Sequence, residues 1–227
     1  MFLPLHDTNP IQHIKFAYVN YSLIAITSLV FFIQSLLPEK ANFELTIYFG
    51  MIPIVVRDIV PQPLAFIPDQ LPLVTYAFLH ADWLHLLSNM LFLFVFGDNI
   101  EDAMGHFRYF VFYMATAALA AGSHLAMNFD SSSPLIGASG AVAGILGAYI
   151  VLYPHARVFV LARIVIPIPL PVPAFWFLGF WIGTQFFYAM FATEGSVAWW
   201  AHIGGMLAGA TLALIFKRSE VPLFGGK

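Results

Sequence analysis

The chain has 227 residues, of which 60% are hydrophobic and only 9% are charged, and its formal net charge is −3. A soluble domain carries about 25% charged residues, so this composition indicates an integral membrane protein. No basic tract suggests a nucleic-acid partner, and the lack of cysteine excludes disulfides, thiolate metal ligands and cysteine nucleophiles. We expect a single membrane domain over residues 1–227, because a second sizeable domain would not fit.

The N-terminus lacks the basic start and short apolar core of a signal peptide, so the first apolar run is expected to remain. A spanning helix needs about 20 mostly apolar residues, and six segments qualify. These are residues 16–37, 82–101, 108–127, 137–154, 173–192 and 197–216. The sequence therefore predicts an all-α bundle of six transmembrane helices. The proline-containing linker over residues 38–79 cannot form one regular helix, and we expect it in the membrane interface.

Six spans place both termini on one side of the membrane. Of the nine Lys and Arg residues, seven fall on that side and two on the other, which predicts cytoplasmic termini. The second, fourth and sixth helices then run inward from the outer surface. His85, Ser139 and His202 each lie in the first third of one of these helices, so we expect all three at a similar depth.

Ser139 is one of the polar residues expected within the membrane, where such groups are functional candidates by default. It lies in the motif GASG between Gly137 and Gly140. Small residues at this spacing also let helices pack closely, so simple packing is an alternative interpretation. In the functional interpretation, the amide groups at the start of the helix could stabilise a developing oxyanion beside the serine.

His85 and Asn89 are four residues apart and so share one face of the second helix. They could bond neighbouring helices or act as donors to a substrate carbonyl. Zinc is a third possibility, but no HExxH motif and no third ligand are evident, and we expect no metal or cofactor. His80 precedes the helix and is expected to tie the first loop to the helix top.

His202 lies on one helix face with Gly205 and Gly209. This glycine ridge should let the sixth helix pack on the fourth and bring His202 within hydrogen-bond reach of Ser139. Histidine is the usual base that activates a serine near neutral pH. No carboxylate is close to His202 in sequence, since Glu194 is eight residues before it, so we expect a dyad rather than a triad.

Together these blocks resemble the rhomboid intramembrane serine proteases over roughly residues 70–216. The motifs are HADWLHLLSN, GASG and AHIGGMLAG, in this order and on the appropriate helices. The resemblance implies that Ser139 is the nucleophile and His202 the general base, and that His85, Asn89 and the Ser139 amide form the oxyanion hole. The supporting residues that it implies are His80, Gly137, Gly140 and Gly205.

The resemblance further implies a six-helix bundle with a water-filled cavity open to the outside. The partners would be the lipid bilayer and transmembrane protein substrates, cut near the outer end of a membrane segment. The chain most resembles bacterial members with a short N-terminus, which implies the bacterial inner membrane. The sequence departs from some members by having Leu71-Pro72 in place of a Trp-Arg pair. It also has Ala143 in place of an aromatic residue that stacks on the histidine, and we expect Trp199 or Trp200 to hold His202 instead.

Two other classes of function remain. A transporter or proton channel would need polar groups through the full depth, whereas the lower halves of the fourth and sixth helices are apolar. An inactive rhomboid-like scaffold that binds transmembrane clients is the closer alternative, although such relatives usually lack the serine or the histidine. The aromatic fifth helix suits lipid contact and predicts sideways access for substrate past it. The sequence leaves the substrate and the oligomeric state open.

Overall fold

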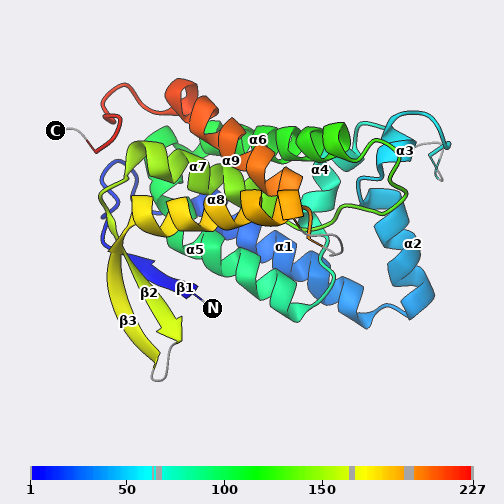
Figure 1. Cartoon of the computed structure of the whole chain (residues 1–227), viewed down its shortest axis with the longest axis horizontal. Helices are drawn as coiled ribbons and strands as arrows, with labels where there is room; N and C mark the ends of the chain where they lie inside the picture. The colour runs from blue at the N-terminus through cyan, green and yellow to red at the C-terminus, as the bar shows by residue number, and fades with distance from the viewer. Residues whose placement is uncertain (1, 63, 65–67, 164–166, 192–196, 226–227) are drawn as a thin grey trace.

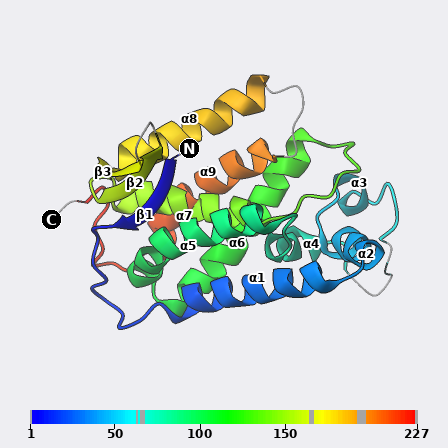
Figure 2. The same cartoon turned by 90° about the horizontal axis from the view of Figure 1, so that it is seen from below.

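The computed structural model describes residues 2–62, 64, 68–163, 167–191 and 197–225, and it is a helical bundle with a small sheet at one end (Figure 1). The prediction of an all-α polytopic membrane protein is confirmed to the extent that the described chain is mostly helical and has several helices fit to cross a membrane, beside a small sheet. Figure 2 shows α1 and α8 on opposite sides of the bundle, with α7 and α9 between them. The long helices are α1 (Tyr18–Leu36), α5 (Trp83–Met104), α6 (His106–Met127), α7 (Ser139–Leu152), α8 (Ala174–Phe191) and α9 (Trp199–Phe216).

Five helices in the described part of the chain are long and apolar enough to cross a membrane, and α7 is shorter. The expected span over residues 137–154 is therefore a helix of only 14 residues. It is roughly 21 Å long, less than the ~30 Å of the hydrocarbon core. Gly137, with φ of +114°, delays its start, and Pro154 disfavours helical backbone at the preceding residue. Most of α7 is buried among the other helices, so it does not need to match the bilayer thickness.

The linker between α1 and α5 holds short helices between its prolines. They are α2 (Glu39–Phe49), α3 (Pro53–Val56), α4 (Pro72–Thr75) and the 3₁₀ helix η1 (Tyr76–Phe78). In α3 and α4 proline occupies the first turn, where its missing N–H costs no helical hydrogen bond. No residue of α2 is buried. This helix lies beside the bundle at the end opposite the sheet (Figure 1), and its location in the membrane interface stays a prediction.

The three-stranded sheet was not predicted, because the proline-rich segment 155–172 looked like a linker. Its strands are β1 (Phe2–Asp7), β2 (Arg157–Arg163) and β3 (Pro167–Pro173). All pairing is antiparallel in the order β1-β2-β3. In β3 every second residue is proline, which is tolerated at a sheet edge. The sheet brings β1 and the segment after α9 to the same end of the bundle (Figure 1).

Buried carboxylates join the N-terminal segment to the end of α5. Glu101 is fully buried and accepts hydrogen bonds from the Val19 and Asn20 amides at 3.0 and 2.7 Å, so it caps the start of α1. The next residue, Asp102, accepts hydrogen bonds from the amides of residues 12–14. Hydrogen bonds from several amides offset the cost of burying each of these side chains. These contacts fix the chain entering α1 against the end of α5.

Candidate active site

The loop that delivers Ser139 is held by backbone contacts on both sides. Met51 and Leu135 exchange two hydrogen bonds, at 2.8 and 3.1 Å. The Gly137 amide donates to the Tyr76 carbonyl at 3.0 Å, and the Ala138 amide donates to His80 Nε2 at 3.4 Å. Ser139 is then the first residue of α7, and the first amides of a helix have no intrahelical acceptor. The serine therefore sits beside free N–H groups at the positive end of the helix.

Close packing of α9 against α7 positions His202. A Cβ atom on Gly205 would lie 2.1 Å from the Gly140 carbonyl oxygen, and one on Gly209 would lie 1.9 Å from the Gly144 oxygen. Only glycine permits this approach. It leaves Ser139 Oγ 2.8 Å from His202 Nε2, while the histidine side chain is 8% exposed. The structure thus brings the predicted nucleophile and base together.

The other ring nitrogen of His202 is bound by Gln185, a residue that the sequence reasoning missed. Gln185 belongs to α8, is 4% exposed, and has its Oε1 atom 2.7 Å from His202 Nδ1. In the sequence, Gln185 stands out as a lone amide in the apolar stretch WIGTQFFYAM. A catalytic triad, by contrast, predicts a carboxylate as the partner of the histidine. Glu194, the nearest carboxylate in sequence, lies outside the described residues.

Aromatic rings flank His202, as expected from the departure at Ala143. The Trp199 ring stands edge-on at 6.1 Å between centroids, and the Trp181 ring of α8 lies at 5.8 Å. Trp200 links α9 to α6 through its backbone, since its carbonyl accepts a hydrogen bond from Ser123 Oγ at 2.9 Å. The tryptophan that α8 supplies was not anticipated.

Asp82 places His85 in the first turn of α5. Its carboxylate accepts a hydrogen bond from the His85 amide at 2.8 Å and so caps the helix. The His85 ring faces the loop before the serine, because a Cβ on Gly137 would lie 2.5 Å from its Cε1 and Nε2 atoms. Asn89 is buried one turn later, and its Nδ2 donates to the His85 carbonyl at 3.0 Å. One N–H of the Asn89 amide is thereby used within α5, leaving the second for another acceptor.

His80 is buried and lies against His85, with 4.9 Å between ring centroids. Its amide also donates to Gln34 Oε1 at 3.2 Å, so it links α1 to the loop before Ser139. Burial, together with the neighbouring His85, lowers the pKa of His80 to about 3. The ring is therefore neutral, as its Nε2 must be to accept from the Ala138 amide.

The aromatic face expected on the fifth helix is divided in the structure. Trp176 and Phe187 are exposed and suit lipid contact. Phe177 is buried instead and stacks against Phe92 at 6.3 Å and Phe96 at 6.4 Å. With Trp181 beside His202, these contacts show that one side of α8 faces the bundle core. The lipid contact expected of the aromatic fifth helix therefore does not extend to Phe177.

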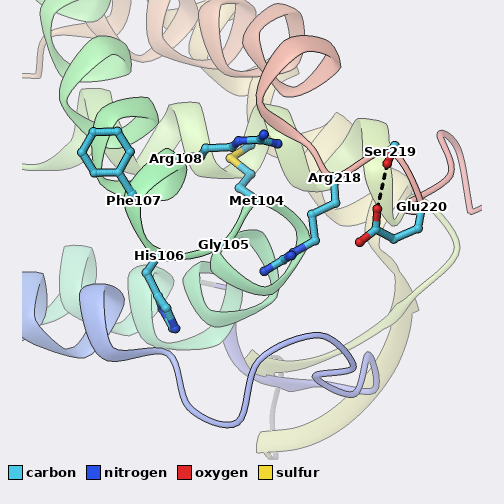
Figure 3. Close-up of a pocket in the computed structure, with 8 residues that line it drawn as sticks. All are labelled: Met104, Gly105, His106, Phe107, Arg108, Arg218, Ser219 and Glu220. Atoms are coloured by element: carbon cyan, nitrogen blue, oxygen red, sulfur yellow. Dashed lines mark hydrogen bonds between the residues drawn. The ribbon is translucent and has the colours of Figure 1, made fainter.

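A cavity of about 450 Å³ lies at the other end of the bundle (Figure 3). It is lined by residues 104–108 and 218–220. Arg218 donates from Nε to the Asp102 carbonyl at 3.2 Å and from its amide to the Ala103 carbonyl at 2.8 Å. This residue follows α9, so the cavity lies roughly 24 Å along the helix from His202. The cavity is separate from the Ser139 site, and its Arg218 contacts hold the C-terminal segment against α5.

The fold and the site define a polytopic membrane protein in which a half-buried serine contacts a buried histidine, and the histidine contacts a buried glutamine. Comparison with known proteins agrees: residues 69–219 match the Rhomboid domain. The chain therefore belongs to the rhomboid family.

The chain is similar to curated proteins that are named as rhomboid or rhomboid-like. The chain is 30% identical over 155 residues to Rhomboid protein 1, mitochondrial, of Saccharomyces cerevisiae, a match covering 63% of this chain and 41% of that protein. It is 38% identical over 74 residues to Rhomboid-like protein 11, chloroplastic, of Arabidopsis thaliana, covering 32% of this chain and 25% of the relative. The matches thus span between a quarter and two fifths of these relatives' lengths.

Proposed function

We propose that this protein is an intramembrane serine endopeptidase that cleaves transmembrane segments of membrane proteins through Ser139 and His202. The observation that carries the proposal is the 2.8 Å contact between Ser139 Oγ and His202 Nε2 inside an apolar bundle. A hydroxyl becomes an effective nucleophile when a base accepts its proton in the transition state. Family membership supports the same chemistry.

The reaction follows from this contact. His202 Nε2 accepts the Ser139 proton as Oγ forms a bond to the substrate carbonyl carbon. The resulting tetrahedral intermediate collapses, its C–N bond breaks, and the imidazolium gives its proton to the leaving amine. Water then adds to the acyl-serine with His202 as base, which releases the second product and restores the serine hydroxyl.

The developing oxyanion needs donors that are already in place. The candidates are the Ser139 amide at the start of α7, the His85 ring, and the free N–H of Asn89. The His85 ring lies beside Gly137, two residues before Ser139, and Asn89 follows His85 by one turn of α5, which supports this assignment. Loss of one such donor typically lowers kcat by about 10²–10³-fold. We expect a loss of this order in Asn89→Ala, with little change in KM.

The substrate would be a membrane segment that can unwind near the outer surface, because a helical peptide bond is hydrogen-bonded and shielded. We infer that the dyad lies at the outer side of a bacterial inner membrane and that both termini are cytoplasmic. The natural lack of cysteine allows a direct test. A single cysteine at the exposed Ser219 should react with an impermeant thiol reagent only from the cytoplasmic side, and one at Ser132 only from outside.

The closest alternative is a scaffold that binds transmembrane clients without cutting them. The experiment that distinguishes a protease from a scaffold uses purified protein in liposomes with a fluorescently tagged transmembrane substrate. We expect wild type to release a fragment, and Ser139→Ala and His202→Ala to release none. Ser35→Ala is a matched control on α1, where the hydroxyl bonds only the preceding turn. Binding without cleavage by wild type across several rhomboid substrates would favour the scaffold.

A further inference from the structure

The Gln185 side chain is held at both ends of its amide. Its Nε2 atom donates to the Trp181 carbonyl at 3.2 Å and to Thr184 Oγ1 at 3.1 Å. Its Oε1 atom faces His202 Nδ1 at 2.7 Å. Since Gln185 lies on α8 and His202 on α9, this amide is a direct polar link between the two helices.

The Trp181 carbonyl determines which end of the Gln185 amide faces His202. A backbone carbonyl can only accept, so Trp181 requires the NH₂ group of Gln185 on its side. The reversed amide would place Oε1 against that carbonyl oxygen. Oε1 must therefore point to His202, and Nδ1 must carry a proton to donate to it. A neutral imidazole protonated at Nδ1 has its lone pair at Nε2, which is the atom that faces Ser139 Oγ.

We propose that Gln185 is the positioning residue of this site: it holds His202 in the Nδ1–H tautomer and in the orientation that makes Nε2 the base for Ser139. This inference rests on the proposed protease function. The buried carboxylate of a serine protease triad orients histidine in the same way but also stabilises the imidazolium. The Gln185 amide orients the ring without adding a charge.

The test is the rate at which a fluorophosphonate probe labels the purified full chain, measured from about pH 5 to 9. Gln185→Leu removes the acceptor, and we expect labelling about 10- to 100-fold slower, as when partners that orient other functional histidines are lost. Gln185→Glu keeps the size and the acceptor. Its carboxylate should stabilise the imidazolium, so we expect substantial activity with the acid limb of the pH profile moved to higher pH.

Thr211→Val is the matched control, since this hydroxyl on α9 bonds only the Leu207 carbonyl. Thermal unfolding of each variant separates lost folding from lost positioning. The inference is overturned if folded Gln185→Leu labels as fast as wild type, or if the acid limb of Gln185→Glu stays where it is in wild type. Failure of wild type itself to label and to cleave would instead contradict the proposed function.

Discussion

Gly137 shows how one backbone torsion and one missing side chain determine the position of Ser139. Its φ of +114° is a conformation that residues with a Cβ rarely adopt, and a Cβ would lie 2.5 Å from the His85 ring. The torsion turns the chain into α7, and the missing side chain leaves room for His85. The torsion and the missing side chain therefore both shape the space next to Ser139.

We therefore predict that Gly137→Ala lowers both stability and activity. The strained torsion should cost ~1–3 kcal/mol in the free energy of unfolding. Displacement of His85 and of the loop should slow fluorophosphonate labelling at least about tenfold. Thermal unfolding in detergent and labelling rates measure the two effects. Gly122→Ala on α6 is the control, because a Cβ there meets no atom within 4 Å. Equal behaviour of the two variants would contradict this account.

Sequence reasoning brought out Ser139, His85, Asn89 and His202 because each is a polar side chain in a segment that should lie in lipid. It missed Gln185, whose relevance appears only when α8 packs against α9. A search guided by triads looks for a carboxylate, and an amide that orients a histidine from another helix has no fixed spacing in sequence. The identity of the candidate pair could thus be predicted, but the partner that holds its geometry could not.

At the scale of elements, the close contact between α7 and α9 positions Ser139 and His202. Gly147 of α7 also contributes, since its Cβ would lie 2.0 Å from the Met206 carbonyl oxygen. Helices in lipid gain little from hydrophobic burial and associate through such close contact of small residues. Oγ and Nε2 reach hydrogen-bond distance because the two backbones almost touch.

Gly209→Ala should separate the two helices although it lies nearly two turns from His202. Its Cβ would meet the Gly144 carbonyl oxygen at 1.9 Å, and a backbone group cannot rotate away. We predict a lower melting temperature and labelling slowed by about 10²-fold, the scale expected for a 1 Å misplacement of reacting groups. Gly183→Ala on α8, where a Cβ has no neighbour within 4 Å, should behave like wild type. Normal labelling of Gly209→Ala would show that the close contact between α7 and α9 does not determine the distance between Ser139 and His202.

Hydropathy predicted the long helices well because lipid imposes a simple length and composition on each. It placed the fourth segment but overestimated its length, since a helix surrounded by protein escapes the length requirement. The sheet was missed because β1 pairs with β2 about 150 residues later in the chain, and its proline-rich β3 has the composition of a linker. Long-range pairing of this kind leaves no periodic signal.

At the scale of the whole molecule, Asp7 ties the N-terminal strand to the bundle. Its carboxylate accepts hydrogen bonds from Tyr149 of α7 and, at 3.1 Å, from Asn99 of α5. Burial raises the pKa of Asp7 to about 6, the Tyr149 hydrogen bond opposes this rise, and Asp98 adds to it. The folded chain therefore binds this proton more tightly than the unfolded chain, whose aspartate pKa is near 3.8.

Asp7 makes the free energy of unfolding depend on pH. As pH rises from about 4 to about 6, only the unfolded state has already lost the Asp7 proton, so this residue makes the free energy of unfolding fall. Above pH 6 its contribution is constant. We predict that Asp7→Asn removes this part of the dependence, visible as a difference between melting curves of variant and wild type at pH 4, 5, 6 and 7. Parallel curves would mean that Asp7 titrates normally in the folded protein.

The most direct test of the central claim, an activated serine inside the bundle, is fluorophosphonate labelling with the modified residue located by mass spectrometry. The account predicts one modification, on Ser139, in wild type, and none at that residue in His202→Ala, which keeps the hydroxyl but removes its base. Labelling of Ser139 at the same rate in His202→Ala would contradict the claim, because the serine would then be reactive without the histidine 2.8 Å away.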